Sequence, residues 1–92
     1  VKISPEVVEH KLAHHVNHPF FLYGVEDELL GQKLIMVVEG DASESTQINN
    51  QLKGCDELEK YEFPKEVYFV SEILRNNGKY LRGKTTKAFE IS

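Results

Sequence analysis

The segment over residues 75–82 combines residue types that suit the binding of anions. Asn76, Asn77 and Gly78 are typical of a turn, because Asn and Gly tolerate positive φ angles, and Lys79 follows them directly. We therefore expect the compact ammonium group of Lys79 at an exposed tip. Where a carboxylate must approach a phosphate, a lysine between them lowers the repulsion and stabilises the charge of the pentavalent transition state. Taken by itself, the same pattern also describes an ordinary exposed turn lysine.

Three other groups of polar residues have simpler structural interpretations. His10, His14 and His18 recur every four residues, a spacing that could bind a transition metal, but no H-E-x-x-H pattern accompanies them. The histidines lie opposite the apolar stripe of the same predicted helix, so we expect them to face solvent and to bind no metal. Cys55 has no neighbouring cation in the sequence that would activate its thiol, so a catalytic role is not expected. The acidic run over residues 56–62 is expected to be a solvated surface.

The composition limits the class of protein. A chain of 92 residues allows one small domain, and its 40% hydrophobic and 28% charged residues are typical of an ordinary soluble globular domain. The longest apolar run, residues 34–38, is far below the roughly 18 residues that a membrane span requires. We expect a cytoplasmic protein, because Cys55 has no partner for an internal disulfide and no secretory signal is present. The absence of an initiator Met leads us to expect that the chain begins within a longer protein.

The charges divide by position. Residues 1–74 carry a net charge of −8, whereas residues 75–92 carry +4. A basic segment can bind nucleic acid, anionic lipid or the phosphates of a small ligand. Because Tyr80 is the only aromatic residue among five closely spaced cations and the rest of the chain is acidic, nucleic acid is not the expected partner.

Apolar spacing predicts a small single α+β domain with a central sheet of about three strands flanked by helices. Ser4 and Pro5 predict a helix start, with the Ser4 hydroxyl capping a free N–H group. Val8, Leu12 and Val16 predict the buried stripe of that helix. The predicted elements are helices over residues 5–16, 45–52 and 83–89 and strands over residues 20–25, 33–39 and 66–70. The first two strands are expected to pair.

Seven short motifs resemble, in the same order, those of the C-terminal domain of the AMP-forming acyl-CoA synthetases, the adenylate-forming family. They are Lys2–Glu9 (KISPEVVE), His18-Pro19, Tyr23–Glu28 (YGVEDE), Leu30–Lys33 (LGQK), Val37–Glu39 (VVE), Tyr61–Lys65 (YEFPK) with Val70, and Gly78–Arg82 (GKYLR). The resemblance extends over essentially all of the chain. It departs from the family before Gly78, where residues 73–77 stand in place of the usual Leu-Pro-x-Thr stretch. The family's hinge residue and Gly pair, which precede the position of Lys2, are outside the chain.

The resemblance implies a lid domain, covering residues 1–92, whose N-terminal adenylation domain is absent. The complete enzyme is expected to use ATP, Mg²⁺ and CoA, bound mainly by the absent domain, to activate a small carboxylic acid; the isolated chain is expected to be inactive. The lid rotates between the adenylation and thioester-forming steps. Lys79 is the implied catalytic residue. In one orientation of the lid, the face that carries Lys79 is directed toward the nucleotide. In the other orientation, the opposite face of the lid, near Tyr23, lines the channel for the thiol. The implied cofactor-binding residues are Lys2, Tyr23, Gly24, Gly78 and Arg82.

The N-terminal residues 1–5, the Phe20-Phe21 pair and residues 63–69 are similar to bacterial o-succinylbenzoate:CoA ligases of menaquinone synthesis. A fatty-acid or aryl-acid ligase is equally open, because the acid-binding pocket lies in the absent domain. The alternative function is a non-catalytic binding or regulatory module that has kept the same fold.

Overall fold

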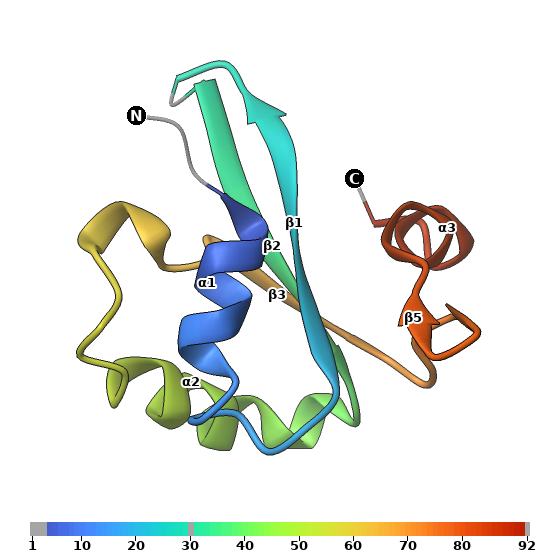
Figure 1. The fold of residues 1–92 in the computed structure, drawn as a ribbon, viewed down its shortest axis with the longest axis horizontal. Helices are drawn as coiled ribbons and strands as arrows, with labels where there is room; N and C mark the ends of the chain where they lie inside the picture. Colours follow the sequence, from blue (N-terminus) through green and yellow to red (C-terminus); the bar gives the residue numbers. More distant parts are fainter. Residues whose placement is uncertain (1–3, 30, 92) are drawn as a thin grey trace.

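The computed structural model describes residues 4–29 and 31–91. It confirms an α+β fold with a three-stranded mixed sheet and a separate two-stranded sheet (Figure 1). The elements are α1 (Pro5–Leu12), β1 (Phe20–Asp27), β2 (Gly31–Glu39), the 3-10 helix η1 (Ala42–Glu44), α2 (Ser45–Lys53), the 3-10 helix η2 (Lys60–Glu62), β3 (Glu66–Val70), β4 (Arg75–Asn76), β5 (Lys79–Tyr80) and α3 (Arg82–Ala88).

The larger sheet has the strand order β1-β2-β3. β1 and β2 are antiparallel, with Phe20 opposite Val38, which confirms the predicted pairing. β2 and β3 are parallel, with Val38 also opposite Phe69. A parallel pair needs a long crossover connection, and the segment containing α2 supplies it. β1 is therefore an edge strand, and one side of its backbone is free to accept contacts from elsewhere in the chain.

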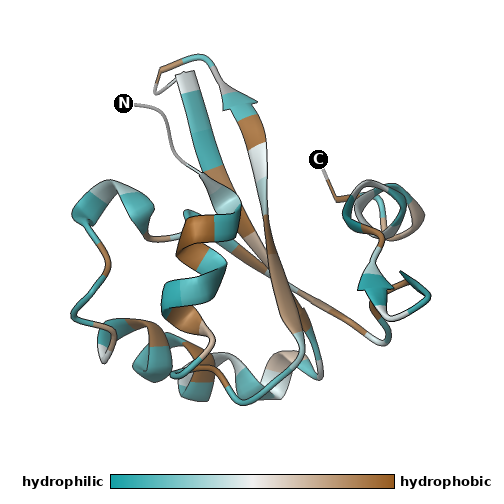
Figure 2. Cartoon of the chain, in the orientation of Figure 1, coloured by the Kyte–Doolittle hydropathy of each residue, from teal (hydrophilic) through white to brown (hydrophobic). Residues whose placement is uncertain are grey.

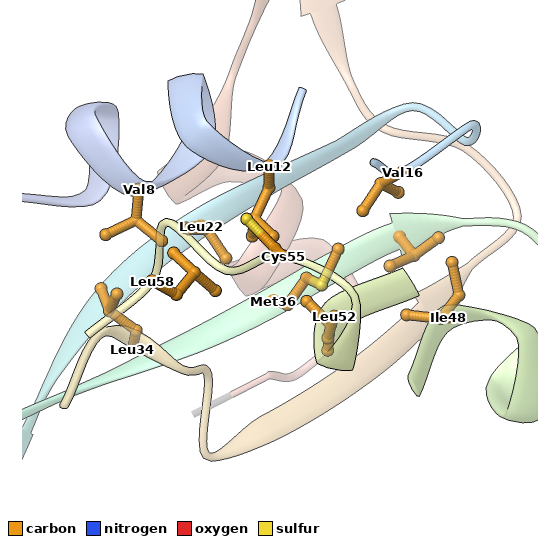
Figure 3. Packing of buried hydrophobic residues seen from close by; sticks show 11 residues of the cluster. Val8, Leu12, Val16, Leu22, Leu34, Met36, Ile48, Leu52, Cys55 and Leu58 are labelled. Atoms are coloured by element: carbon orange, nitrogen blue, oxygen red, sulfur yellow. The ribbon is translucent and has the colours of Figure 1, made fainter. Parts of the chain in front are cut away.

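The main hydrophobic core lies between one face of the sheet and the two helices α1 and α2 (Figures 1 and 3). The predicted stripe of α1 is confirmed, since Val8, Leu12 and Val16 are all buried. Figure 2 shows the alternation of hydrophobic and hydrophilic residues along α1 that produces this one-sided burial. The other buried members of this core are Leu22, Leu34, Met36, Val38, Ile48, Leu52, Cys55 and Leu58.

A second, smaller cluster lies on the opposite face of the sheet. Phe21 and Val37 come from β1 and β2, and successive strand residues point to opposite faces, so they are directed away from α1. They pack with Val70 and Ile73, and Tyr80 of β5 covers them. Figure 1 shows β5 and α3 on this side of the strands, and α1 and α2 on the other. The sheet thus separates the segment that carries Lys79 from the main core.

Two details of the predicted first helix are wrong. The helix ends at Leu12 rather than at Val16. The N–H groups of His15 and Val16 both donate to the Leu12 carbonyl, so the regular helical pattern of hydrogen bonds is not continued. The Ser4 hydroxyl caps no backbone N–H group; it donates to the Glu6 carboxylate at 3.2 Å instead. Within residues 4–29 and 31–91, no helix combines the length and the apolar content that a membrane crossing requires.

Candidate active site

A tight β-hairpin presents Lys79. The predicted turn joins the short strands β4 and β5, in which Asn76 is paired with Lys79. Asn77 and Gly78 connect the strands with φ angles of 54° and 80°. Positive φ at both central residues defines a type I′ turn, whose twist matches that of the paired strands. The turn prediction is therefore confirmed, and Lys79 occupies the first position of the returning strand.

A hollow of about 540 Å³, lined by cationic residues, lies beside this turn. Its lining residues are Arg75, Gly78, Lys79, Tyr80 and Arg82. Lys79 is exposed, and the described part of the chain places no carboxylate within ion-pair distance of its ammonium group. Both arginines, in contrast, are already paired with glutamates. Among the described residues, the hollow therefore offers one unneutralised positive charge with two neutralised ones beside it.

Glu39, the last residue of β2, fixes the entry to the hairpin. Its Oε1 atom accepts a hydrogen bond from the Ile73 backbone N–H and forms an ion pair with Arg75 Nη2, both at 3.0 Å. The Ile73 N–H, followed by Arg75, lowers the pKa of the Glu39 carboxyl below its usual value. Arg75 also donates to the Ile73 carbonyl at 3.0 Å and lies 5.1 Å from the ring centre of Tyr80, its partner across the hairpin. These contacts hold β4 at the end of β2.

Thr85 of α3 joins the hairpin to the helix that follows it. The side chain is fully buried, and its hydroxyl accepts from the Leu74 N–H at 3.1 Å while donating to the Leu81 carbonyl at 2.7 Å. Leu81 in turn donates its N–H to the Leu74 carbonyl at 2.8 Å. One hydroxyl therefore connects the residues just before and just after the hairpin with α3.

Arg82 is held by Glu9, a residue that sequence reasoning did not single out. Arg82 Nη2 lies 2.6 Å from Glu9 Oε1, and Arg82 Nε lies 3.1 Å from Glu9 Oε2. The Oε2 atom of Glu9 also accepts a hydrogen bond from the Leu22 N–H of β1 at 2.7 Å. The hydrogen bond to Glu9 raises the pKa of Arg82. No sequence signal identifies this pair, because 73 positions separate its members and only the fold brings α1 close to the start of α3.

The structure gathers the predicted site residues only in part. Gly78, Lys79 and Arg82 share the hollow, whereas Lys2 lies outside the described residues. Tyr23 packs on the cluster that Tyr80 covers, so it lies on the same side of the sheet as the hairpin and not on the opposite side as expected.

Gly24 of β1 has a close neighbour within the domain itself. A Cβ atom at Gly24 would lie 2.5 Å from Nε2 of Gln32, a flexible and exposed side chain. The missing side chain of Gly24 thus makes room for Gln32 on the neighbouring strand.

The other polar groups are arranged differently from the expectation in two places. His18 leaves the solvent-facing stripe, is half-buried and pairs with Glu44, whereas His10 and His14 are exposed. The Asp41 N–H, followed by His18, lowers the pKa of Glu44. Among the residues that the structure describes, no three His, Cys, Asp or Glu side chains form a possible metal site.

The acidic run is not a fully solvated surface. Glu62 is buried, accepts the Glu59 N–H at 2.8 Å and lies 2.8 Å from Lys11 Nζ of α1. This pair attaches η2 to α1. Cys55 is buried within the main core, and its Sγ lies 3.7 Å from the Lys11 carbonyl oxygen.

No protein-family model and no curated protein matches the sequence. The structure is similar to an AMP-forming acyl-CoA synthetase/AMP-acid ligase II-like protein from Dyadobacter fermentans, with 26% identity and a TM-score of 0.80 over 100% of this chain and 27% of that chain. A fatty acyl CoA synthetase from Mycobacterium tuberculosis matches with 27% identity and a TM-score of 0.70 over 92% of this chain and 17% of its own. The amide bond synthetase McbA from Marinactinospora thermotolerans matches at 24% identity, a TM-score of 0.69, and coverage of 95% and 18%.

These similarities connect the fold with the adenylate-forming enzymes. The chain corresponds to about a quarter or less of the length of each of these neighbours. In structure, the chain is similar to a small part of each of these longer proteins.

Proposed function

We propose that residues 1–92 are the C-terminal lid domain of an AMP-forming acid:CoA ligase. The observation that carries the proposal is the position of Lys79, an exposed and unneutralised cation on a hairpin that is fixed at both ends. The similarity of the whole chain to part of an AMP-forming acyl-CoA synthetase supports it.

The first half-reaction explains the need for such a cation. A carboxylate oxygen of the acid attacks the α-phosphorus of ATP, the bond to the β-phosphate oxygen breaks, and the products are an acyl-adenylate and pyrophosphate. Both reactants are anionic, so Lys79 would reduce their repulsion and stabilise the charge that develops on the phosphoryl group. The type I′ turn holds the backbone of Lys79 in place, while the four-carbon side chain can reach outward.

The cationic hollow fits a phosphate-bearing ligand but not a metal ion. Gly78, Lys79 and Arg82 are among its lining residues, and phosphate oxygens are suited to such donors. Among the described residues there is no carboxylate cluster for Mg²⁺. In the proposed enzyme the preceding domain would supply the Mg²⁺ ligands and most of the ATP contacts, and a bound Mg²⁺ would neutralise phosphate charge there.

In the second half-reaction the thiol sulfur of CoA attacks the acyl carbon, and AMP leaves. The proposed lid rotates between the two steps. Lys2, Tyr23 and Gly24 are the proposed CoA contacts on this chain. The proposed acid is o-succinylbenzoate, with fatty and aryl acids as the alternatives, and the location is cytoplasmic, where an unpaired cysteine such as Cys55 is usual.

The test uses the complete polypeptide that contains this chain. Exchange of labelled pyrophosphate into ATP is measured with o-succinylbenzoate, a fatty acid and an aryl acid. Lys79→Ala is expected to slow this exchange by about 10²–10³-fold while leaving thioester formation from a pre-made acyl-adenylate largely intact. Equal losses in both half-reactions would show that Lys79 is structural. No exchange with any acid in the wild type would favour a non-catalytic binding module.

A further inference from the structure

We infer that Glu9 is a positioning residue that holds Arg82 beside Lys79, so that the arginine and the lysine act together on the same anion. This inference rests on the proposed function. It assigns a role to a carboxylate on the opposite side of the sheet from the hairpin.

The side chains of Glu9 and Arg82 form a pair of fixed geometry, which we call the clamp. Glu9 receives Arg82 through two separate hydrogen bonds, one to each carboxylate oxygen. A bidentate arrangement of this kind restrains the plane of the guanidinium group as well as its position. Glu9 is itself restrained, because its Oε2 atom accepts the Leu22 N–H on the free edge of β1. The carboxylate thus ties the sheet directly to the first residue of α3.

The clamp acts on the hairpin as well as on Arg82. Arg82 follows Lys79 by three residues, and the intervening Leu81 is bonded to Leu74 at the other end of the hairpin. Arg82 uses Nε and Nη2 for Glu9, which leaves N–H groups of the same guanidinium for a second anion. Since Arg82 lines the hollow together with Lys79, a phosphate bound there would contact both side chains.

Because Glu9 pairs with Arg82, Lys79 is the unneutralised cation of the hollow within residues 4–29 and 31–91. Arg75 is paired with Glu39 and Arg82 with Glu9, so each guanidinium contributes directed hydrogen bonds with little net charge. Lys79 contributes the charge. The two residues, three positions apart, thus supply different parts of the contact with an anion.

The experiment compares Glu9→Gln with Glu6→Gln in the complete polypeptide. Glu6 is on the same helix and influences Arg82 only through its charge, so its substitution removes a similar charge without touching the clamp. We expect Glu9→Gln to lower kcat for pyrophosphate exchange by up to about 10²-fold, the scale of a small misplacement of a reacting group, and Glu6→Gln to change it less than twofold. Thioester formation from the pre-made adenylate should be unchanged in both variants.

A double substitution separates positioning from general stability. If Glu9 acts through Arg82, Glu9→Gln has no further effect on kcat in an Arg82→Gln background. Additive losses, equal losses in both half-reactions, or equal effects of Glu9→Gln and Glu6→Gln would overturn the inference. These outcomes differ from failure of the proposed function, which is an absence of exchange in the wild type.

A second measurement on the 92-residue chain tests the inference whatever the activity. Inorganic pyrophosphate is titrated while the side-chain NMR signals of Lys79 and Arg82 are followed. We expect both signals to shift with one common dissociation constant in the wild type, and only the Lys79 signal to shift in Glu9→Gln. A shift of Lys79 alone in the wild type, or of both residues in the variant, would overturn the assignment of Glu9.

Discussion

Replacement of Thr85 by valine tests how the hairpin is attached to the domain. Valine has nearly the same shape as threonine, so the fully buried site stays filled, but it has no hydroxyl. The Leu81 carbonyl still accepts the Thr85 backbone N–H at 2.9 Å, whereas the Leu74 N–H loses its acceptor. Leaving such a group unsatisfied costs about 1–3 kcal/mol. We expect Thr85→Val to lower the free energy of unfolding by that amount.

The neighbouring residue provides a matched control. Thr86 is also buried, but its hydroxyl donates only to the Gly83 carbonyl within α3, at 2.8 Å, and Gly83 is exposed to water. Thr86→Val should therefore lower the free energy of unfolding by less than about 0.5 kcal/mol, the usual limit for substitutions that remove no critical contact. Urea unfolding followed by circular dichroism gives both values, provided that the m values agree. Equal losses would refute the assignment of the Leu74 hydrogen bond as the one that matters.

Three further predictions concern the whole domain and its lysines. The 92-residue chain should unfold cooperatively in a circular-dichroism melt, and a melt without a transition would contradict the packed two-sided sheet. The pKa of Glu62 is lowered by the Glu59 N–H and then by Lys11, so its stabilising effect is present above its unfolded value of 4.5 and is lost as the pH falls through the folded pKa. Glu62→Gln should flatten the dependence of stability on pH below 4.5, and an unchanged slope would contradict this. If the proposed function holds, acetylation of Lys79 should abolish pyrophosphate release by the complete polypeptide without unfolding it; equal loss on acetylation of Lys84 or Lys87 would show that only summed charge matters.

The elements with clear apolar spacing could be predicted from the sequence. The buried stripe of α1, the pairing of β1 with β2, the position of β3 and the turn at Asn77 and Gly78 all follow from local patterns. Each of these patterns depends on neighbours in the chain, through side-chain periodicity or backbone conformation. The same is true of the exposed position of Lys79.

Contacts between distant polar residues could not be predicted in this way. Glu9 looks like any surface glutamate of an amphipathic helix, and only the edge position of β1 and the return of the chain to that edge give it two partners. The expectation of a solvent-facing His18 is wrong because the helix ends early and the chain turns toward Glu44. The expectation of a solvated Glu62 is wrong because its partner Lys11 is 51 positions away in the sequence. In each case the tertiary fold determines the partner.

The division of the apolar residues into two clusters has a consequence for the motions of the domain. The larger cluster holds α1 and α2 on the sheet, whereas the hairpin and the residue Ile91 after α3 pack on the smaller one around Phe21 and Ile73. Segments with fewer buried contacts open at lower free energy than the core. The amide hydrogens of β5 and α3 should thus exchange with deuterium before those of β2, as one cooperative group. We therefore expect the hairpin that carries Lys79 to open as a unit of its own, and substitutions in the smaller cluster to change this local equilibrium more than the stability of the main core.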